Sequence, residues 1–132
     1  MADRGTHTYK EIKEQAAAWE DARLAFLARQ DELLEAWKDM GVERVLFTGC
    51  GSTYYLSEAA ASLFEAQTGI PSRAHPGSEF LLFPERVLQG AEKSLLVTTS
   101  RSGTTTETLL AQKAFRRHGG RGDRSHGDRS PR

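Results

Sequence analysis

Two short apolar runs and a weaker strand candidate between them, each followed by a helical pattern, constrain the fold of this chain more than any other feature. Residues 44–48 and 94–99 are short, rich in valine and leucine, and bounded by polar or glycine residues, which is typical of buried strands. Residues 72–75 form a weaker strand candidate between them. Helical patterns follow these runs at residues 54–68, 78–83 and 105–118. This alternation predicts an α/β fold with a parallel sheet and right-handed crossovers.

The N-terminal part of the chain carries a different pattern. Apolar residues recur at helical spacing through most of residues 1–41, and Trp19 and Trp37 are the largest of them. Thr8 and Glu11 have the spacing of a capping box at the start of a helix. We therefore expect one bent helix or two consecutive helices here, with a packing role. The two tryptophans could instead contact a partner chain.

Bulk composition narrows the partners and the compartment. The formal net charge is zero, so we expect no nucleic acid partner and no binding to an anionic membrane surface. The N-terminus has no apolar core of a signal peptide, and no apolar run approaches the ~20 residues that span a bilayer. Cys50 is the only cysteine, so no intrachain disulfide can form. These features predict a cytoplasmic protein.

Two loops rich in hydroxyl groups follow the two clearest strands. They are Gly49–Thr53 and Ser100–Thr105. If the strands at 44–48 and 94–99 are neighbours, both loops lie where ligands bind in open parallel sheets. Helix N-termini, hydroxyl groups and the guanidinium of Arg101 together favour a phosphate. The alternative is that these hydroxyls only cap helices. Two such loops at one point favour a ligand site.

Two other phosphate-binding motifs are excluded. The chain has no Gly-Lys-Ser/Thr, which a P-loop requires. Tyr54 stands where a dinucleotide-binding fingerprint needs its third glycine, and His75-Pro76 offers no acid for a ribose. We therefore expect no cofactor. We also expect no metal site, because the histidines have no partner at metal-ligand spacing.

Four ordered motifs resemble landmarks of the sugar isomerase (SIS) domain family. They are Thr48–Tyr55, Gly69–Pro71, Gly77–Phe80 and Thr99–Thr108. The likeness is strongest to the isomerase half of the glutamine–fructose-6-phosphate aminotransferases. It implies a flavodoxin-like parallel sheet with flanking helices, a partial SIS domain over residues 42–120, which the N-terminal helices precede. It also implies a sugar phosphate ligand and a homodimer.

The resemblance assigns substrate-binding roles to residues in both loops. Ser100, Ser102 and Thr105 would hold the phosphate. Ser52 and Thr53 would reach the sugar or its phosphate from the first loop. Arg101 occupies a position where the family often has glutamine. The family takes its catalytic acid and base from a second SIS copy and its tail, so no catalytic residue can be assigned here.

The last residues depart from the family pattern. Residues 121–132 contain no large apolar side chain, and Gly122–Ser125 returns as Gly127–Ser130, which predicts a disordered polar tail. Read one nucleotide later, the codons of residues 122–128 can encode Val-Ile-Ala-Val-Thr-Ala-Thr, a good fourth strand. We therefore expect a chain truncated or frameshifted after its third strand.

The favoured function is binding of a ketose or amino-sugar 6-phosphate by a fragment of a sugar-phosphate isomerase or aminotransferase-type enzyme. A non-catalytic module that senses a phosphosugar is one alternative. A gene fragment without function is the other.

Overall fold

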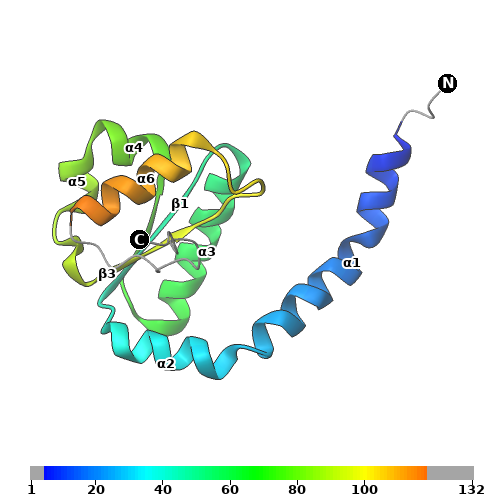
Figure 1. Cartoon of the computed structure of the whole chain (residues 1–132), viewed down its shortest axis with the longest axis horizontal. Coiled ribbons are helices and arrows are strands. Elements are labelled where there is room, and N and C mark those ends of the chain that lie inside the picture. Colours follow the sequence, from blue (N-terminus) through cyan, green and yellow to red (C-terminus); the bar gives the residue numbers. More distant parts are fainter. Residues whose placement is uncertain (1–4, 119–132) are drawn as a thin grey trace, which may run out of the picture. The chain divides into compact units, whose positions relative to one another are not determined.

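A computed structural model describes residues 5–118 of the 132-residue chain. The predicted polar tail at residues 121–132 lies outside the described residues. The chain divides into two compact units, Met1–Asp39 and Met40–Arg132, and each is described by itself. Figure 1 labels helices α1 to α6 and strands β1 and β3.

The first unit is built from helices. Helix α1 spans Thr6–Leu27 and is followed by α2 at Gln30–Met40, so two consecutive helices form. The predicted capping box is wrong. The helix already begins at Thr6, and the Tyr9 amide donates a hydrogen bond to the Gly5 carbonyl at 2.8 Å. Thr8 therefore lies within the first turn, and no side chain caps this helix.

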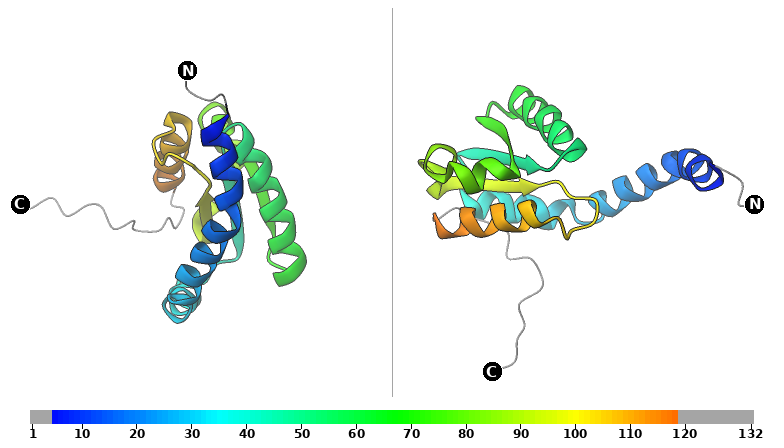
Figure 2. Two further views of the ribbon diagram at one scale, coloured as in Figure 1. Left: turned by 90° about the vertical axis from the view of Figure 1, so that its right-hand side faces the viewer. Right: turned by 90° about the horizontal axis from the view of Figure 1, so that it is seen from above.

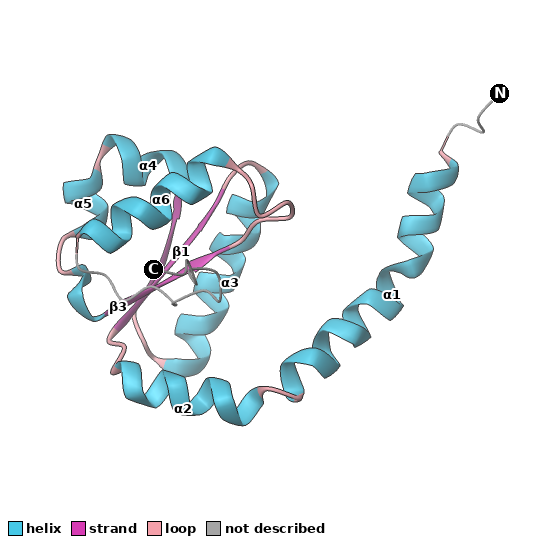
Figure 3. Cartoon of the chain, in the orientation of Figure 1, coloured by secondary structure: helices cyan, strands magenta, loops and turns pink. Residues whose placement is uncertain are grey.

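The second unit contains a parallel sheet of three strands. They are β1 at Arg44–Gly49, β2 at Ser72–Pro76 and β3 at Ser94–Thr98. The strand order is β2-β1-β3, and both pairings are parallel. Figure 3 draws the strands in magenta among the flanking helices. The predicted α/β class and the adjacency of the first and third strands are both confirmed.

Helices cover the two faces of this sheet. Helix α3, Ser52–Thr68, packs against β1 and β2 on one face. Helices α4, α5 and α6 lie on the other face, as the two views of Figure 2 show; they span Gly77–Leu82, Pro84–Leu88 and Thr106–Arg117. Because right-handed crossovers from β1 to β2 and from β2 to β3 run in opposite directions, they cross opposite faces. The change of direction falls between β1 and β3.

The segment between β2 and β3 is more helical than the sequence predicts. One short helix is expected over residues 78–83, but α4 begins at Gly77 and a second helix, α5, begins at Pro84. Proline suits the first position of a helix, where its missing N–H has no intrahelical partner to lose. A short 3-10 helix at Ala91–Lys93 then leads into β3.

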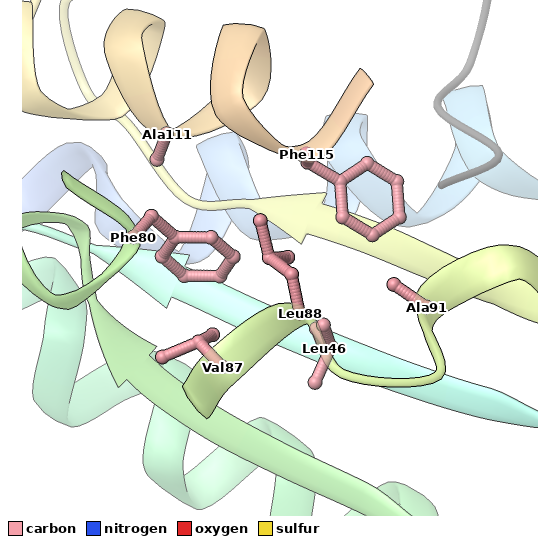
Figure 4. Packing of buried hydrophobic residues seen from close by; sticks show 7 residues of the cluster. All are labelled: Leu46, Phe80, Val87, Leu88, Ala91, Ala111 and Phe115. Atoms are coloured by element: carbon pink, nitrogen blue, oxygen red, sulfur yellow. The ribbon is translucent and has the colours of Figure 1, made fainter. Parts of the chain in front are cut away.

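The side chains of β1 alternate between two apolar layers. Leu46 faces the side of α4 to α6, where it belongs to a buried cluster with Phe80, Val87, Leu88, Ala91, Ala111 and Phe115 (Figure 4). On the opposite face, the ring centroid of Phe47 lies 6.2 Å from that of Phe64 in α3. Burial on both faces explains why the central strand reads as a continuous apolar run.

Candidate functional site

The two hydroxyl-rich loops leave the same edge of the sheet. β1 and β3 are adjacent and parallel, so their carboxyl ends lie side by side. The pairing continues beyond β3, because the Thr99 amide donates to the Thr48 carbonyl at 2.8 Å. The geometric premise of the predicted ligand site, two loops converging at the switch point, therefore holds in the fold.

The first loop is closed by Thr53. Its Oγ1 accepts a hydrogen bond from the Cys50 amide at 3.0 Å and donates to the Cys50 carbonyl at 3.0 Å. A Cβ at Gly49 would lie 2.5 Å from the Thr53 carbonyl carbon, so only glycine fits this position. Ser52, which follows Gly51, is exposed at the start of α3. Thr53 thus fixes the loop, and Ser52 faces solvent.

The second loop is held by its own serines. Ser100 Oγ accepts a hydrogen bond from the Gly103 amide at 3.0 Å. Ser102 Oγ lies 3.2 Å from the Thr104 amide and 3.1 Å from Thr104 Oγ1, and it accepts from both. Arg101 is exposed between the two serines. These bonds fold Ser100–Thr104 into a compact turn just before α6.

Neither helix that starts at this edge is capped by a side chain. The N-cap residue is Gly51 for α3 and Thr105 for α6, and neither makes a side-chain cap hydrogen bond. Backbone N–H groups in the first turn of a helix lack the usual partner four residues earlier and carry partial positive charge. In α3 one of them, the Tyr54 amide, donates to the Gly51 carbonyl at 3.1 Å. The alternative that the loop hydroxyls serve as helix caps is therefore not what the structure shows.

Ser57 on α3 connects the two loops through hydrogen bonds. It was not predicted as a site residue from the sequence. Its hydroxyl is 0% exposed and lies 2.9 Å from the Thr53 carbonyl and 3.1 Å from Thr99 Oγ1. Thr53 closes the first loop and Thr99 precedes the second, so Ser57 couples their positions. A polar residue one helical turn after the loop is the signal that could have identified it.

A hollow of about 300 Å³ opens beside the first loop. Its walls come from Gly49, Cys50, Gly51, Tyr54, Tyr55, Pro76, Gly77, Ser78 and Glu107. The hollow therefore lies between the end of β1, the start of α4 and the first turn of α6. None of the six predicted site residues lines it. Its tyrosines and Glu107 were not among the site residues predicted from the sequence.

Electrostatic pairs surround this edge. The Tyr54 hydroxyl donates to Glu58 Oε1 at 2.8 Å, and this bond raises the pKa of Tyr54 above its usual value. Glu79 Oε2 lies 2.9 Å from His75 Nδ1 and 3.0 Å from an Arg86 guanidinium nitrogen. The hydrogen bond from His75, with a further contribution from Arg86, holds the pKa of Glu79 below its usual value. Tyr54 is thus a neutral donor, and Glu79 is committed to an ion pair.

The described residues contain neither a metal-binding cluster nor a membrane-spanning helix. No group of three or more His, Cys, Asp or Glu side chains within residues 5–118 could hold a metal ion. Across the same residues, every helix is too short or too polar to cross a bilayer.

The chain is similar in sequence to several enzymes that share one name. No family model matches the chain. It is 36% identical over 120 residues to the glutamine–fructose-6-phosphate aminotransferase (isomerizing) of Methanothermobacter thermautotrophicus, in an alignment that covers 86% of the chain and 19% of the relative. The corresponding enzyme of Acidithiobacillus ferridurans is 33% identical over 108 residues, covering 77% of the chain and 17% of the relative.

Solved structures agree with the sequence relatives. The fold matches the crystal structure of tagatose-6-phosphate ketose/aldose isomerase from Escherichia coli with a TM-score of 0.77 and 26% identity, over 86% of the chain and 32% of that structure. The chain belongs to the SIS domain family. It spans about a fifth of the length of the curated relatives it matches, 19% in the first case.

Proposed function

We propose that this chain binds a ketose or amino-sugar 6-phosphate at the edge formed by the carboxyl ends of β1 and β3. The phosphate lies against the Ser100–Thr105 loop and the start of α6. Ser100, Arg101, Ser102 and Thr105 are its partners there, and Ser52 and Thr53 contact the ligand from the first loop.

The single observation that carries this proposal is the pair of uncapped helix N-termini beside two adjacent parallel strands. Helices α3 and α6 both start without a side-chain cap. A phosphate satisfies free backbone N–H groups and interacts favourably with the helix dipole. The exposed Arg101 adds a charge-assisted donor beside the same loop. Two anion-binding ends at one switch point favour a phosphorylated ligand over a neutral one.

The hollow beside the first loop supports a sugar as the rest of that ligand. Its lining residues include Glu107, Tyr54, Tyr55 and the Gly49–Gly51 turn. A carboxylate and a phenol bond sugar hydroxyls, and aromatic rings contact the apolar faces of sugars. The relatives are named for fructose 6-phosphate and tagatose 6-phosphate, which fits this assignment.

The proposal also covers the domain bounds, the compartment and the oligomeric state of the protein. We assign residues 42–120 to the phosphosugar-binding domain, residues 1–41 to an accessory helical segment and residues 121–132 to a polar tail. The domain acts in the cytoplasm, because a charged phosphate ester stays in the compartment where it is made. As in its relatives' family, it works within a homodimer and as part of an isomerase or aminotransferase-type system.

Calorimetric titration with fructose 6-phosphate and with glucosamine 6-phosphate tests the proposal. We expect binding of at least one of them and none of unphosphorylated fructose. Thr105→Ala and Ser102→Ala should each weaken binding by roughly tenfold, the effect of one lost hydrogen bond to a charged group. Ser62→Ala is the matched control. Ser62 is exposed and lies in the second half of α3, away from the helix N-terminus at the proposed site.

Three results would contradict the proposal. One is a folded chain that binds neither sugar phosphate. Another is equal binding of fructose with and without its phosphate. The third is loss of affinity in Ser62→Ala as large as in Thr105→Ala.

A further inference from the structure

Helix α1 carries an apolar stripe with the spacing of a coiled coil. Its members alternate at three and four residues along the helix: Tyr9, Ile12, Ala16, Trp19, Arg23 and Phe26, named here the α1 seam. A repeat of 3.5 residues keeps such a stripe facing a partner helix along a left-handed supercoil. Arg23 is the one charged member, at a position where its long aliphatic stem can still pack.

The α1 seam is open in the described structure. No residue of α1 is buried. Trp19 is 74% exposed and Tyr9 65%, and Ile12 and Phe26 are both more than half exposed. Large aromatic side chains lined up on one helix face mark an interaction surface more often than chance exposure.

We propose that this face pairs with the α1 seam of a second copy of the chain, with the two helices antiparallel. In that arrangement the two central layers match by size, and the outer layers pair aromatic rings. Trp19 of each copy stands opposite the small Ala16 of the other, and Tyr9 stands opposite Phe26. Bulky residues facing small ones fill the space between helices without overlap. The remaining layer sets Ile12 against the stem of Arg23.

A parallel pairing of the same seam is disfavoured. Each residue would then face its own copy, so Trp19 would meet Trp19 and Ala16 would meet Ala16. One layer would be overfilled and the other left empty. Arg23 would also face Arg23, two like charges at the core of the seam. The antiparallel arrangement separates these two guanidinium groups.

The charges beside the seam fit the antiparallel partner. Lys13 and Glu20 both flank it on the same side, each one residue after an apolar member. When Ala16 faces Trp19, Lys13 of each copy lies between the same two layers as Glu20 of the other, which gives two symmetric ion pairs. Within one helix, Glu20 Oε1 already lies 2.7 Å from an Arg23 guanidinium nitrogen, so its carboxylate is held at the edge of the seam. The pattern is self-complementary only between antiparallel copies.

Charge reversal in the full chain tests the pairing. Lys13→Glu makes both flanking positions acidic, and Glu20→Lys makes both basic, so each variant alone turns two attractions into repulsions. We expect each to self-associate roughly tenfold more weakly than the natural chain, from the usual strength of two exposed ion pairs reversed in sign. When the two variants are mixed, all four charges become complementary, so heterodimers should form in preference to either homodimer. Native mass spectrometry of one isotope-labelled and one unlabelled variant measures this preference.

The control uses a second ion pair on the same helix. Lys10 Nζ and Glu14 Oε1 lie 3.7 Å apart and point away from the seam, so Lys10→Glu mixed with Glu14→Lys should give random exchange. Random exchange between the Lys13 and Glu20 variants would overturn the proposal, even if the chain dimerises through its sheet domain. A monomeric natural chain would overturn it as well, because the seam would then lie against the same molecule or against nothing. Binding between the Lys10 and Glu14 variants equal to that of the test pair would show a general charge effect and would also overturn it.

Discussion

At the residue scale, the site depends on side chains that fix the loops more than on those that face solvent. The Thr53 hydroxyl bonds to backbone, and the Ser57 hydroxyl bonds to backbone and to the Thr99 side chain. These hydrogen bonds hold the two loops in place. Gly49 allows this arrangement, because the first turn of α3 lies where its side chain would stand. The predicted contact residues Ser52 and Arg101 are exposed. A preformed loop can thus present exposed donors to a ligand at little further entropic cost.

Gly49→Ala should be strongly destabilising for a steric reason. The new Cβ would lie 2.5 Å from the Thr53 carbonyl carbon and 2.6 Å from its oxygen, both backbone atoms. We expect a loss of about 3 kcal/mol in the free energy of unfolding, at the upper end of overpacking effects. Urea denaturation followed by circular dichroism measures it.

Gly90→Ala provides the comparison for that measurement. Gly90 has φ +69°, but a Cβ there meets nothing within 4 Å. We expect Gly90→Ala to lower the free energy of unfolding by only about 1 kcal/mol, the cost of a left-handed backbone conformation for a residue with a Cβ. Equal unfolding midpoints for the two variants would show that close contact with α3 does not constrain Gly49.

At the scale of secondary-structure elements, Glu79 ties three segments together beside the site. It lies on α4 and binds His75 of β2 and Arg86 of α5. The ring of Phe80, the next residue, lies edge-on to His75 at 6.2 Å and is itself fully buried. Because α4 forms one wall of the hollow, this network positions Gly77 and Ser78 as well as stabilising the helix pair.

Glu79→Gln should change how stability depends on pH. The pKa of Glu79 is lowered in the folded state, so the unfolded chain takes up the proton at a higher pH than the folded one. The stabilisation is therefore complete above the ordinary pKa of 4.5 and is lost as the pH falls through the folded-state value. We expect Glu79→Gln to cost about 1 kcal/mol at neutral pH and much less in acid.

The measurement is the urea unfolding free energy at several pH values from neutral to acid. Glu85→Gln is the control, because Glu85 is exposed on the neighbouring α5. A destabilisation by Glu79→Gln that stays constant down to acid pH would refute the ion-pair role of Glu79.

At the scale of the whole sheet, β3 forms one edge of the sheet within the described residues. Among the described strands, β3 pairs only with β1. Leu95 and Val97 are in register with Val45 and Phe47, so they face the layer of α3, but they are only half-buried while their β1 neighbours are buried. An unpaired edge beside partly uncovered apolar side chains is a template for association with other strands.

Val97→Lys should therefore raise the concentration at which the chain stays soluble. A charge on an edge strand discourages edge-to-edge pairing at small cost, since the lysine stem can cover the same apolar surface. Light scattering at increasing protein concentration measures the effect. Leu82→Lys makes the same charge change at a residue that is 69% exposed on α4. An equal gain in solubility from Leu82→Lys would mean that net charge, not the edge of β3, governs association.

Much of this architecture could be predicted because it depends on residues that are neighbours in the sequence. The apolar run at 44–48, the glycine-rich turn after it and the hydroxyl-rich turn after 94–99 depend on neighbours in the chain, so strands, loops and the family likeness could be read directly. The tail hypothesis stays a prediction, as do the roles of the six predicted site residues. What failed was the placement of ends: the helix start at Thr8 and the single helix over 78–83 depend on how the backbone enters each helix.

The sequence by itself determined the α/β class, the order of strands and helices, and the presence of two phosphate-compatible loops. Only the tertiary structure decided that no side chain caps the helices at those loops. It also showed that Ser57 bridges them and that the hollow is lined by Tyr54, Tyr55 and Glu107 instead of by the predicted hydroxyls. The physical reason is that hydrogen-bond partners and cavity walls come from elements distant in the chain. Their contacts are fixed by packing, which local periodicity does not encode.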